Sequence, residues 1–132
     1  MKTMITVITI MLCLQLSAPP NNSVVVIASE GISFYEPLIK AVTMVESRDG
    51  KYLYNPKENA VGWFQIRQIR VDHYNQLRGT NYILADFYDY NLSREMYLYF
   101  AAGKSYENAA KDWNGTGPMT IDYWHKIQKH LN

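Results

Sequence analysis

Residues 35–50 read YEPLIKAVTMVESRDG, and their apolar positions recur at the spacing of an α-helix. Leu38 and Val45 belong to one apolar row, and further apolar side chains lie beside it. Pro37 suits the first turn of a helix, where its missing N–H leaves no hydrogen bond unmade. Asp49-Gly50 is a stop signal. The stretch therefore predicts an amphipathic helix that opens next to the proline and ends before the glycine.

Four later segments combine apolar residues at helical spacing with a capping residue or a glycine stop. The first carries its apolar row through Ile69 and Leu77, and Ser93 is the expected N-cap of the second. Ser105 and Thr120 are expected to cap the third and the fourth. The segments lie near residues 66–78, 93–102, 105–113 and 120–131.

The connections between these segments are short. Lys51 to Asn59 is predicted to be a loop with a turn at Asn55-Pro56. Residues 80–92 are irregular in pattern and rich in tyrosine. About five helices with short connections predict an all-α or mostly α single domain over residues 35–132.

The N-terminus has the pattern of a secretory signal peptide. Lys2 precedes an apolar run from Met4 to Leu16, and the small residues Ser17-Ala18 follow. The run is too short for a membrane span, which needs roughly 20 residues. We therefore expect a signal peptide over residues 1–18, an extended lead-in over residues 19–34, and export to the periplasm or out of the cell. An uncleaved N-terminal anchor is the alternative.

Composition and charge exclude several classes of protein. The 132 residues carry 13 Lys and Arg against 12 Asp and Glu. With no basic run, this balance argues against nucleic acid as the main partner. Cys13 is the single cysteine, so an internal disulfide and a cysteine-based zinc site are excluded, while a lipoprotein stays an alternative. We expect neither a metal nor a cofactor, because the histidines have no recognised ligand spacing: His73, His125 and His130.

Glu46 occupies an unusual position in the first predicted helix. On a helical wheel it falls between Val42 and Ile39, inside the apolar arc. It also lies in the last turn, near the negative end of the helix dipole. Partial burial and the dipole both disfavour the ionised form, so we expect a raised pKa. The functional interpretation is a general acid, and the structural alternative is a glutamate paired with a lysine or arginine at the rim of the core.

Two further segments carry polar groups next to aromatic residues. In Gly62–Ile66, GWFQI, Gln65 offers both a hydrogen-bond donor and an acceptor, for a substrate or for tying down a loop. Trp113-Asn114-Gly115 is predicted to end a helix, because Asn and Gly accept left-handed backbone angles. Trp113 and Asn114 would then face a groove at that helix end.

The order of these motifs resembles the lytic transglycosylase (SLT), goose-type lysozyme-like family. The elements are Glu46-Ser47, then Gly62-x-x-Gln65-Ile66, then Trp113-Asn114-Gly115, with Tyr123 following. The resemblance spans about residues 36 to 131. It implies a lysozyme-like all-α domain over residues 35–132 with a substrate cleft.

The resemblance also implies an activity. The substrate would be peptidoglycan glycan strands, cut at the β-1,4 bond between N-acetylmuramic acid and N-acetylglucosamine with a 1,6-anhydro product. Glu46 would be the single catalytic acid and base. Secretion, conjugation or phage-entry machinery is a further expected setting, without a stable membrane span. The expected substrate-binding residues are Gln65, Trp113, Asn114, Asn59, Ser47 and Tyr88.

The chain departs from the family pattern at several positions. Trp63-Phe64 stands where Leu-Met is usual, and Trp113 stands where Tyr is usual. Pro56 replaces a serine that often contacts the catalytic carboxylate or the substrate. We expect Asn55 or Asn59 to take over the role of that serine.

Two alternatives remain open at this point. A hydrolytic lysozyme on the same fold would need a second carboxylate to activate water. A catalytically weak domain that binds glycan or a protein partner would need none. The carboxylates available for the first alternative are Asp49, Glu58, Asp86 and Asp89.

Overall fold

A computed structural model describes residues 22–131 of the chain, with side chains from residue 33 on. The predicted signal peptide over residues 1–18 lies outside the described residues. The described part is mainly helical, which confirms the all-α prediction. Its elements are α1 (Asn22–Ser47), β1 (Tyr54–Asn55), β2 (Ala60–Val61), α2 (Gln68–Arg78), a 3₁₀ helix (Leu84–Tyr88), α3 (Tyr90–Ala101), α4 (Tyr106–Asn114) and α5 (Met119–Gln128).

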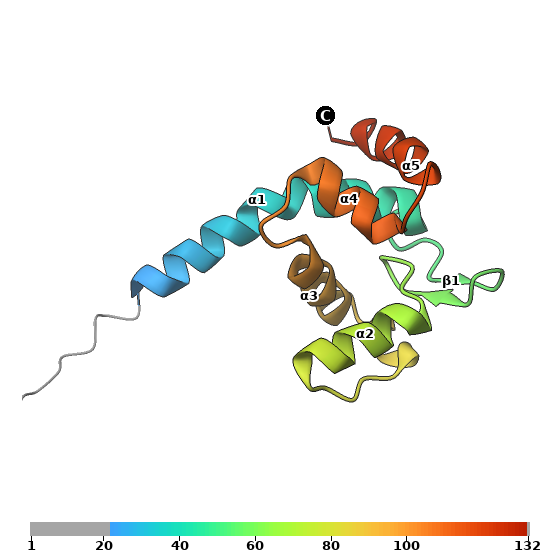
Figure 1. Cartoon of the computed structure of the whole chain (residues 1–132), viewed down its shortest axis with the longest axis horizontal. Coiled ribbons are helices and arrows are strands. Elements are labelled where there is room, and N and C mark those ends of the chain that lie inside the picture. The colour runs from blue at the N-terminus through green and yellow to red at the C-terminus, as the bar shows by residue number, and fades with distance from the viewer. Residues whose placement is uncertain (1–21, 132) are drawn as a thin grey trace, which may run out of the picture.

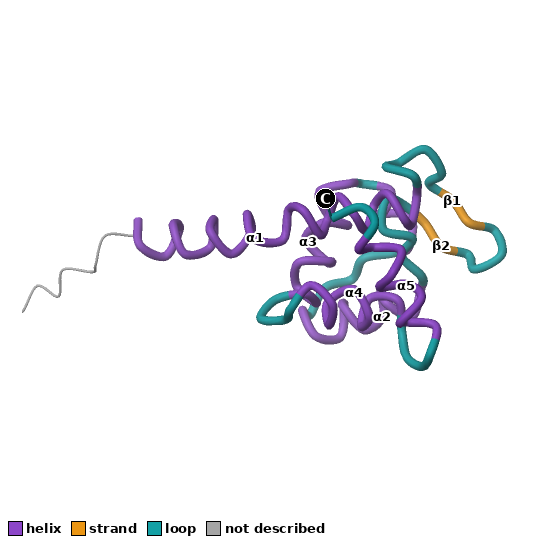
Figure 2. The backbone as a smooth tube through the Cα atoms, turned by 90° about the horizontal axis from the view of Figure 1, so that it is seen from above, coloured by secondary structure: helices purple, strands orange, loops and turns teal. Residues whose placement is uncertain are grey.

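The helices assemble around the second half of α1. Its first turns project from the rest of the domain, as both views show (Figures 1 and 2). The second half of α1 contacts α3, α4 and α5, and α4 also packs on α5. The β1–β2 hairpin lies beyond the C-terminal end of α1 (Figure 1). The end of α1 therefore meets the segments that follow it.

The start of α1 differs from the sequence prediction. Residues 22–34 are helical, where an extended lead-in was expected, and Pro37 lies inside the helix instead of in its first turn. Once the buried half of the helix has formed, each further turn adds hydrogen bonds without a new nucleation cost. The β-branched run Ser23–Ser29 opposes this extension by only a few tenths of a kcal/mol per residue.

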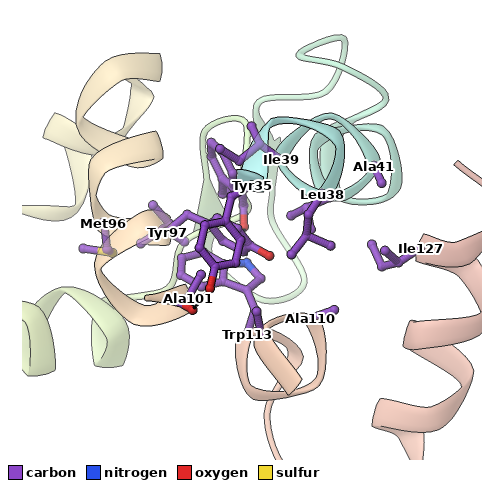
Figure 3. Close-up of a cluster of buried hydrophobic side chains, with 14 of the residues drawn as sticks. Tyr35, Leu38, Ile39, Ala41, Met96, Tyr97, Ala101, Ala110, Trp113 and Ile127 are labelled. Atoms are coloured by element: carbon purple, nitrogen blue, oxygen red, sulfur yellow. Dashed lines mark hydrogen bonds between the residues drawn. The ribbon is translucent and has the colours of Figure 1, made fainter. Parts of the chain in front are cut away.

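The core is built on the α1 residues that the helical spacing identified. Leu38 and Val42 are completely buried, and the neighbouring elements contribute large aromatic rings. Phe64 stacks on Tyr97 with ring centroids 5.2 Å apart, and the indole of Trp113 meets Tyr97 edge-on at 5.0 Å. Figure 3 shows this cluster between α1, α3 and α4. Aromatic pairs at these separations add attraction beyond the area that they bury.

The predicted loop after α1 contains a short antiparallel hairpin. Tyr54 pairs with Val61, and Asn55 pairs with Ala60. Val61 also forms a bridge with Ile66, which closes a tight turn over residues 62–65. The turn places the GWFQI segment beside the end of α1. The sequence indicated the turn at Asn55-Pro56 but not the strand pairs that flank it.

Three helix predictions need correction. In α5 the helix begins at Met119 after Pro118, so Thr120 lies inside it and is not its N-cap. In α2 the buried residues are Val71 and Tyr74, so the apolar row through Ile69 and Leu77 faces solvent. At the start of α3 the N-cap is Asp89, whose carboxylate accepts from the amide of Leu92, and not Ser93. In α2, packing against neighbouring elements outweighs the local pattern. In α3, Asp89 is itself a favourable N-cap residue, so the helix begins earlier than Ser93. In α4, Ser105 is the N-cap as predicted.

Candidate active site

The last turn of α1 positions Glu46. The helix ends at Ser47, and Arg48 and Asp49 then take left-handed backbone angles, with φ of 51° and 57°. The amide of Asp49 donates to the carbonyl oxygen of Thr43 at 3.0 Å, which fixes this reversal. Glu46 therefore sits partly buried on a rigid helix end, as the wheel predicted.

The environment of Glu46 favours its neutral form. Burial raises the pKa of the carboxyl from 4.5 to about 7, and the negative charge of Glu58 also raises it. A hydrogen bond from Tyr123 and the charges of Arg67 and Lys126 act in the opposite direction. Since burial outweighs these, the predicted rise is confirmed.

Tyr123 of α5 is the hydrogen-bond partner of Glu46. Its hydroxyl donates to Oε1 of Glu46 at 2.6 Å. Burial and the nearby carboxylate raise the pKa of Tyr123 well above its usual value, so the phenol keeps its proton. Among residues 33–131, no lysine or arginine nitrogen lies within 4.0 Å of Glu46. The partner of Glu46 is therefore a neutral phenol, and not the lysine or arginine of the ion-pair alternative.

A cleft of about 470 Å³ opens at this carboxyl group. Four of the predicted site residues meet in its lining, although they come from three separate parts of the chain. The lining residues are Glu46, Glu58, Gln65, Ile66, Arg67, Ile69, Arg70, His73, Trp113, Asn114, Thr116 and Met119.

Gln65 has one of the two roles that the sequence left open, fixing the loop, and the other, a substrate contact, stays a prediction. Its Nε2 donates to the carbonyl oxygens of Tyr52 at 3.1 Å and Gly62 at 3.0 Å, which ties down the loop. Its own backbone takes a left-handed φ of 49°. The side-chain oxygen Oε1 has no hydrogen-bond donor among residues 33–131, so it can accept one from a ligand in the cleft.

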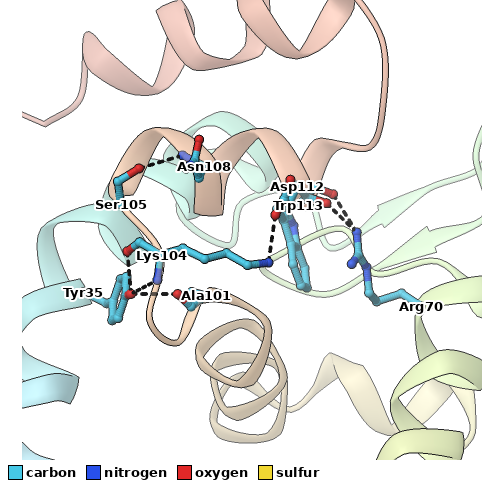
Figure 4. A network of polar contacts seen from close by, with 8 residues as sticks. All are labelled: Tyr35, Arg70, Ala101, Lys104, Ser105, Asn108, Asp112 and Trp113. Atoms are coloured by element: carbon cyan, nitrogen blue, oxygen red, sulfur yellow. Dashed lines mark hydrogen bonds and ion pairs between the residues drawn. The ribbon is translucent and has the colours of Figure 1, made fainter.

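The end of α4 is locked in place by Arg70. One guanidinium nitrogen donates to the carbonyl oxygens of Asp112 at 3.1 Å and Trp113 at 2.9 Å (Figure 4). The guanidinium also lies 4.8 Å from the centroid of the Trp113 ring. The indole nitrogen of Trp113 in turn donates to the carbonyl oxygen of Phe64 at 3.2 Å. These contacts hold Trp113 and Asn114 at the cleft.

Three predicted binding residues do not line the cleft. Ser47 is buried, and its hydroxyl lies 2.9 Å from the carbonyl oxygen of Trp63 and accepts from the amide of Gly50. It therefore has a structural role instead of the predicted substrate contact. Asn59 lies at the exposed tip of the hairpin, and Tyr88 is exposed at the end of the 3₁₀ helix. Neither belongs to the lining.

The cleft also contains charged residues that sequence reasoning did not assign to it. Glu58 was one of four candidate carboxylates, and no local signal distinguished it from the others. Arg67, Arg70 and His73 recur three residues apart, so that a polar face of α2 could have been found from the spacing. The apolar row through Ile69 obscured that face.

Two features are absent from the described part of the chain. No group of three or more His, Cys, Asp or Glu gathers there as a metal site. No helix of residues 22–131 has the length and apolar character needed to cross a membrane.

Comparison with known proteins finds no match: no family model, no curated protein and no solved structure is similar to the chain. The functional interpretation of the cleft therefore rests on its own residues.

Proposed function

We propose that the protein is an exported peptidoglycan lytic transglycosylase that acts in the periplasm or outside the cell. Its reaction would cleave the β-1,4 bond between N-acetylmuramic acid and N-acetylglucosamine, with Glu46 as the single acid and base. One observation carries this proposal: the carboxyl group of Glu46 has a pKa of about 7 and lines a cleft together with Gln65 and Asn114.

The first step needs a proton donor. With a pKa of about 7, close to half of the Glu46 side chains are protonated at pH 7. Tyr123 occupies Oε1, which leaves Oε2 to carry the proton. That proton would pass to the glycosidic oxygen as the bond to C1 of the muramyl residue breaks. The N-acetyl carbonyl of the substrate would stabilise the cationic C1.

The second step needs a base in the same place. The Glu46 carboxylate would take the proton of the muramyl 6-hydroxyl while O6 attacks C1. A 1,6-anhydro ring forms, Glu46 regains its proton, and no water is consumed. A general acid tuned to the working pH contributes roughly 10²–10⁴-fold to rate. The side-chain oxygen of Gln65 and the amide of Asn114 would hold the acetamido groups.

The test compares Glu46→Gln with a matched variant of the same helix, Glu36→Gln. Glu36 pairs with Arg94 and does not line the cleft. Mass spectrometry of muropeptides released from purified sacculi should detect 1,6-anhydro products from the wild type and from Glu36→Gln. We expect Glu46→Gln to release at least a hundredfold less. More than about a tenth of wild-type activity in Glu46→Gln would reject Glu46 as the acid.

Glu58 supports a second candidate, a hydrolytic muramidase. It lines the same cleft, and its charge acts on Glu46. Two carboxylates across a scissile bond are the usual requirement for glycoside hydrolysis. In this case the products would carry reducing-end muramic acid, and Glu58→Gln would lose roughly 10²–10⁴-fold in rate. A transglycosylase would instead keep most of its activity in Glu58→Gln and release anhydro products.

A further inference from the structure

One wall of the cleft is cationic. Arg67, the residue before α2, and Arg70 of α2 both line the cavity that contains Glu46. A neutral glycan chain needs no such charges for binding. The cationic wall therefore suggests a part of the ligand other than the neutral sugar hydroxyls and acetamido groups.

Arg70 has a structural role. Its guanidinium donates to two carbonyl oxygens at the end of α4 and stacks over the rings of Trp113 and Phe100, with the Phe100 centroid at 5.0 Å. Substitution of Arg70 would remove these contacts and so destabilise the position of the C-terminal end of α4. Any ligand contact made by Arg70 would thus be inseparable from its structural role.

Arg67 differs from Arg70 in this respect. Its side chain is exposed within the cleft lining, and among residues 33–131 no carboxylate lies within 4.0 Å of it. Its backbone is fixed, because its carbonyl oxygen accepts from the amides of Arg70 at 2.9 Å and Val71 at 3.3 Å. Arg67 is therefore a cation on a fixed backbone that lines the cleft without a carboxylate partner in the part of the chain whose side chains are described.

Peptidoglycan offers a matching anion. Each muramyl residue carries a lactyl group whose carboxyl is either free or linked to a peptide, and that peptide has carboxylates of its own. We propose that Arg67 binds a carboxylate on the muramyl substituent and so selects peptidoglycan over uncharged N-acetylglucosamine polymers. This inference rests on the proposed function. The planar guanidinium can form two parallel hydrogen bonds to a carboxylate, which also fixes the register of the glycan.

The experiment measures binding in the Glu46→Gln background, so that no substrate is consumed. The variants add Arg67→Gln, Arg67→Lys, or the matched control Arg78→Gln. Arg78 is in the last turn of the same helix, lies near Glu95 and does not line the cleft. The substrates are purified sacculi, sacculi whose carboxylates have been converted to methylamides, and glycan strands stripped of peptide by an amidase.

We expect Arg67→Gln to weaken binding to native sacculi about tenfold, as for one lost charge-assisted hydrogen bond. Arg78→Gln should bind as the parent does, and Arg67→Lys should recover part of the loss. On methylamidated sacculi all four proteins should bind alike. A tenfold effect that persists on stripped strands assigns the contact to the lactyl carboxylate, and one that disappears there assigns it to the peptide.

Equal binding of Arg67→Gln and Arg78→Gln to native sacculi would overturn the inference. So would a loss for Arg67→Gln that is as large on methylamidated sacculi, or an absence of binding by every variant. The proposed catalysis is judged separately, in the wild-type chain. A wild-type protein that releases no muropeptide, while the carboxylate-dependent loss is observed, would contradict the catalysis and support the Arg67 contact.

Discussion

At the scale of single residues, the proposed chemistry depends on the protonation of Glu46. Its carboxyl lies in a partly buried place at the end of a helix, and one phenol donates to it. Burial is the largest cause of its raised pKa, and the opposing contribution of Tyr123 is smaller. A glutamate in this state is an acid near neutral pH, at the cost of some stability.

The pH dependence of activity follows from that pKa. Because the free enzyme must enter the reaction with Glu46 protonated, kcat/KM should fall above about pH 7. In Glu58→Gln the same limb should shift to lower pH, because the charge of Glu58 raises the pKa of Glu46. The profile of the rate of muropeptide release between pH 3 and pH 9 tests both statements. A falling limb near pH 4.5 would contradict the assignment of the acid.

The difference in stability between the wild type and Glu46→Gln should also depend on pH. In the wild type, folding raises the pKa of Glu46 from 4.5 to about 7. The contribution of Glu46 to the unfolding free energy is therefore fully present below about pH 4.5 and is lost as the pH rises to 7. Glutamine does not titrate. Relative to the wild type, Glu46→Gln should therefore gain about 3 kcal/mol in unfolding free energy between pH 4 and pH 8. Urea unfolding at the two pH values measures the gain, and a constant difference would argue against a neutral buried carboxyl.

At the scale of elements, the turn over residues 62–65 carries Gln65 to the cleft. Gly62 has a φ of 77°, and a Cβ atom built on it would lie 2.0 Å from the carbonyl oxygen of Phe87. That oxygen also accepts from the hydroxyl of Ser93 at 2.6 Å. The turn therefore packs closely against the 3₁₀ helix and α3. The backbone of Gly62 contacts the backbone of Phe87 directly, and no room is left for a side chain at position 62.

Gly62→Ala should destabilise the fold by about 3 kcal/mol, since it combines overpacking with a strained left-handed angle. Gly79→Ala is the matched control. Gly79 has a φ of 65° and ends α2, but a Cβ atom added there would have no neighbour within 4 Å. We expect it to cost about 1 kcal/mol. Equal midpoints for the two variants in urea would show that the contact with Phe87 does not constrain the turn.

At the scale of the whole molecule, the cleft exists because distant helices meet. The hydroxyl of Tyr123 on α5 reaches Glu46 on α1, which are 77 positions apart. Arg70 ties α2 to the end of α4. Each of these contacts couples the geometry of the cleft to the packing of the helices. A shift of one helix would therefore change the surroundings of the Glu46 carboxyl group.

Tyr123→Phe tests this coupling. Loss of the hydrogen bond should raise the pKa of Glu46, because that bond lowers it, and the falling limb of kcat/KM should move to higher pH. The carboxyl would also lose its fixed orientation, so kcat should drop by about tenfold or more. Kinetics and a pH profile together measure both effects. An unchanged profile would mean that the phenol does not act on the acid.

Local patterns in the chain were sufficient for several features. Helical spacing located Glu46 in the apolar arc of α1, and burial together with the helix end was enough to predict the direction of its pKa. Motif order grouped Gln65, Trp113 and Asn114 with it. The predictions for Glu46 succeeded because they depend on periodicity within one element, whereas the grouping came from the order of the motifs along the whole chain.

Other features were decided by tertiary structure alone. The entry of Glu58 into the cleft and the burial of Ser47 have no local signal. The buried face of α2 passes through Tyr74 instead of Leu77 because neighbouring helices, and not the apolar row itself, determine which side loses contact with water. A sequence pattern specifies that a face is apolar, but the surface that covers it comes from elements far away in the chain.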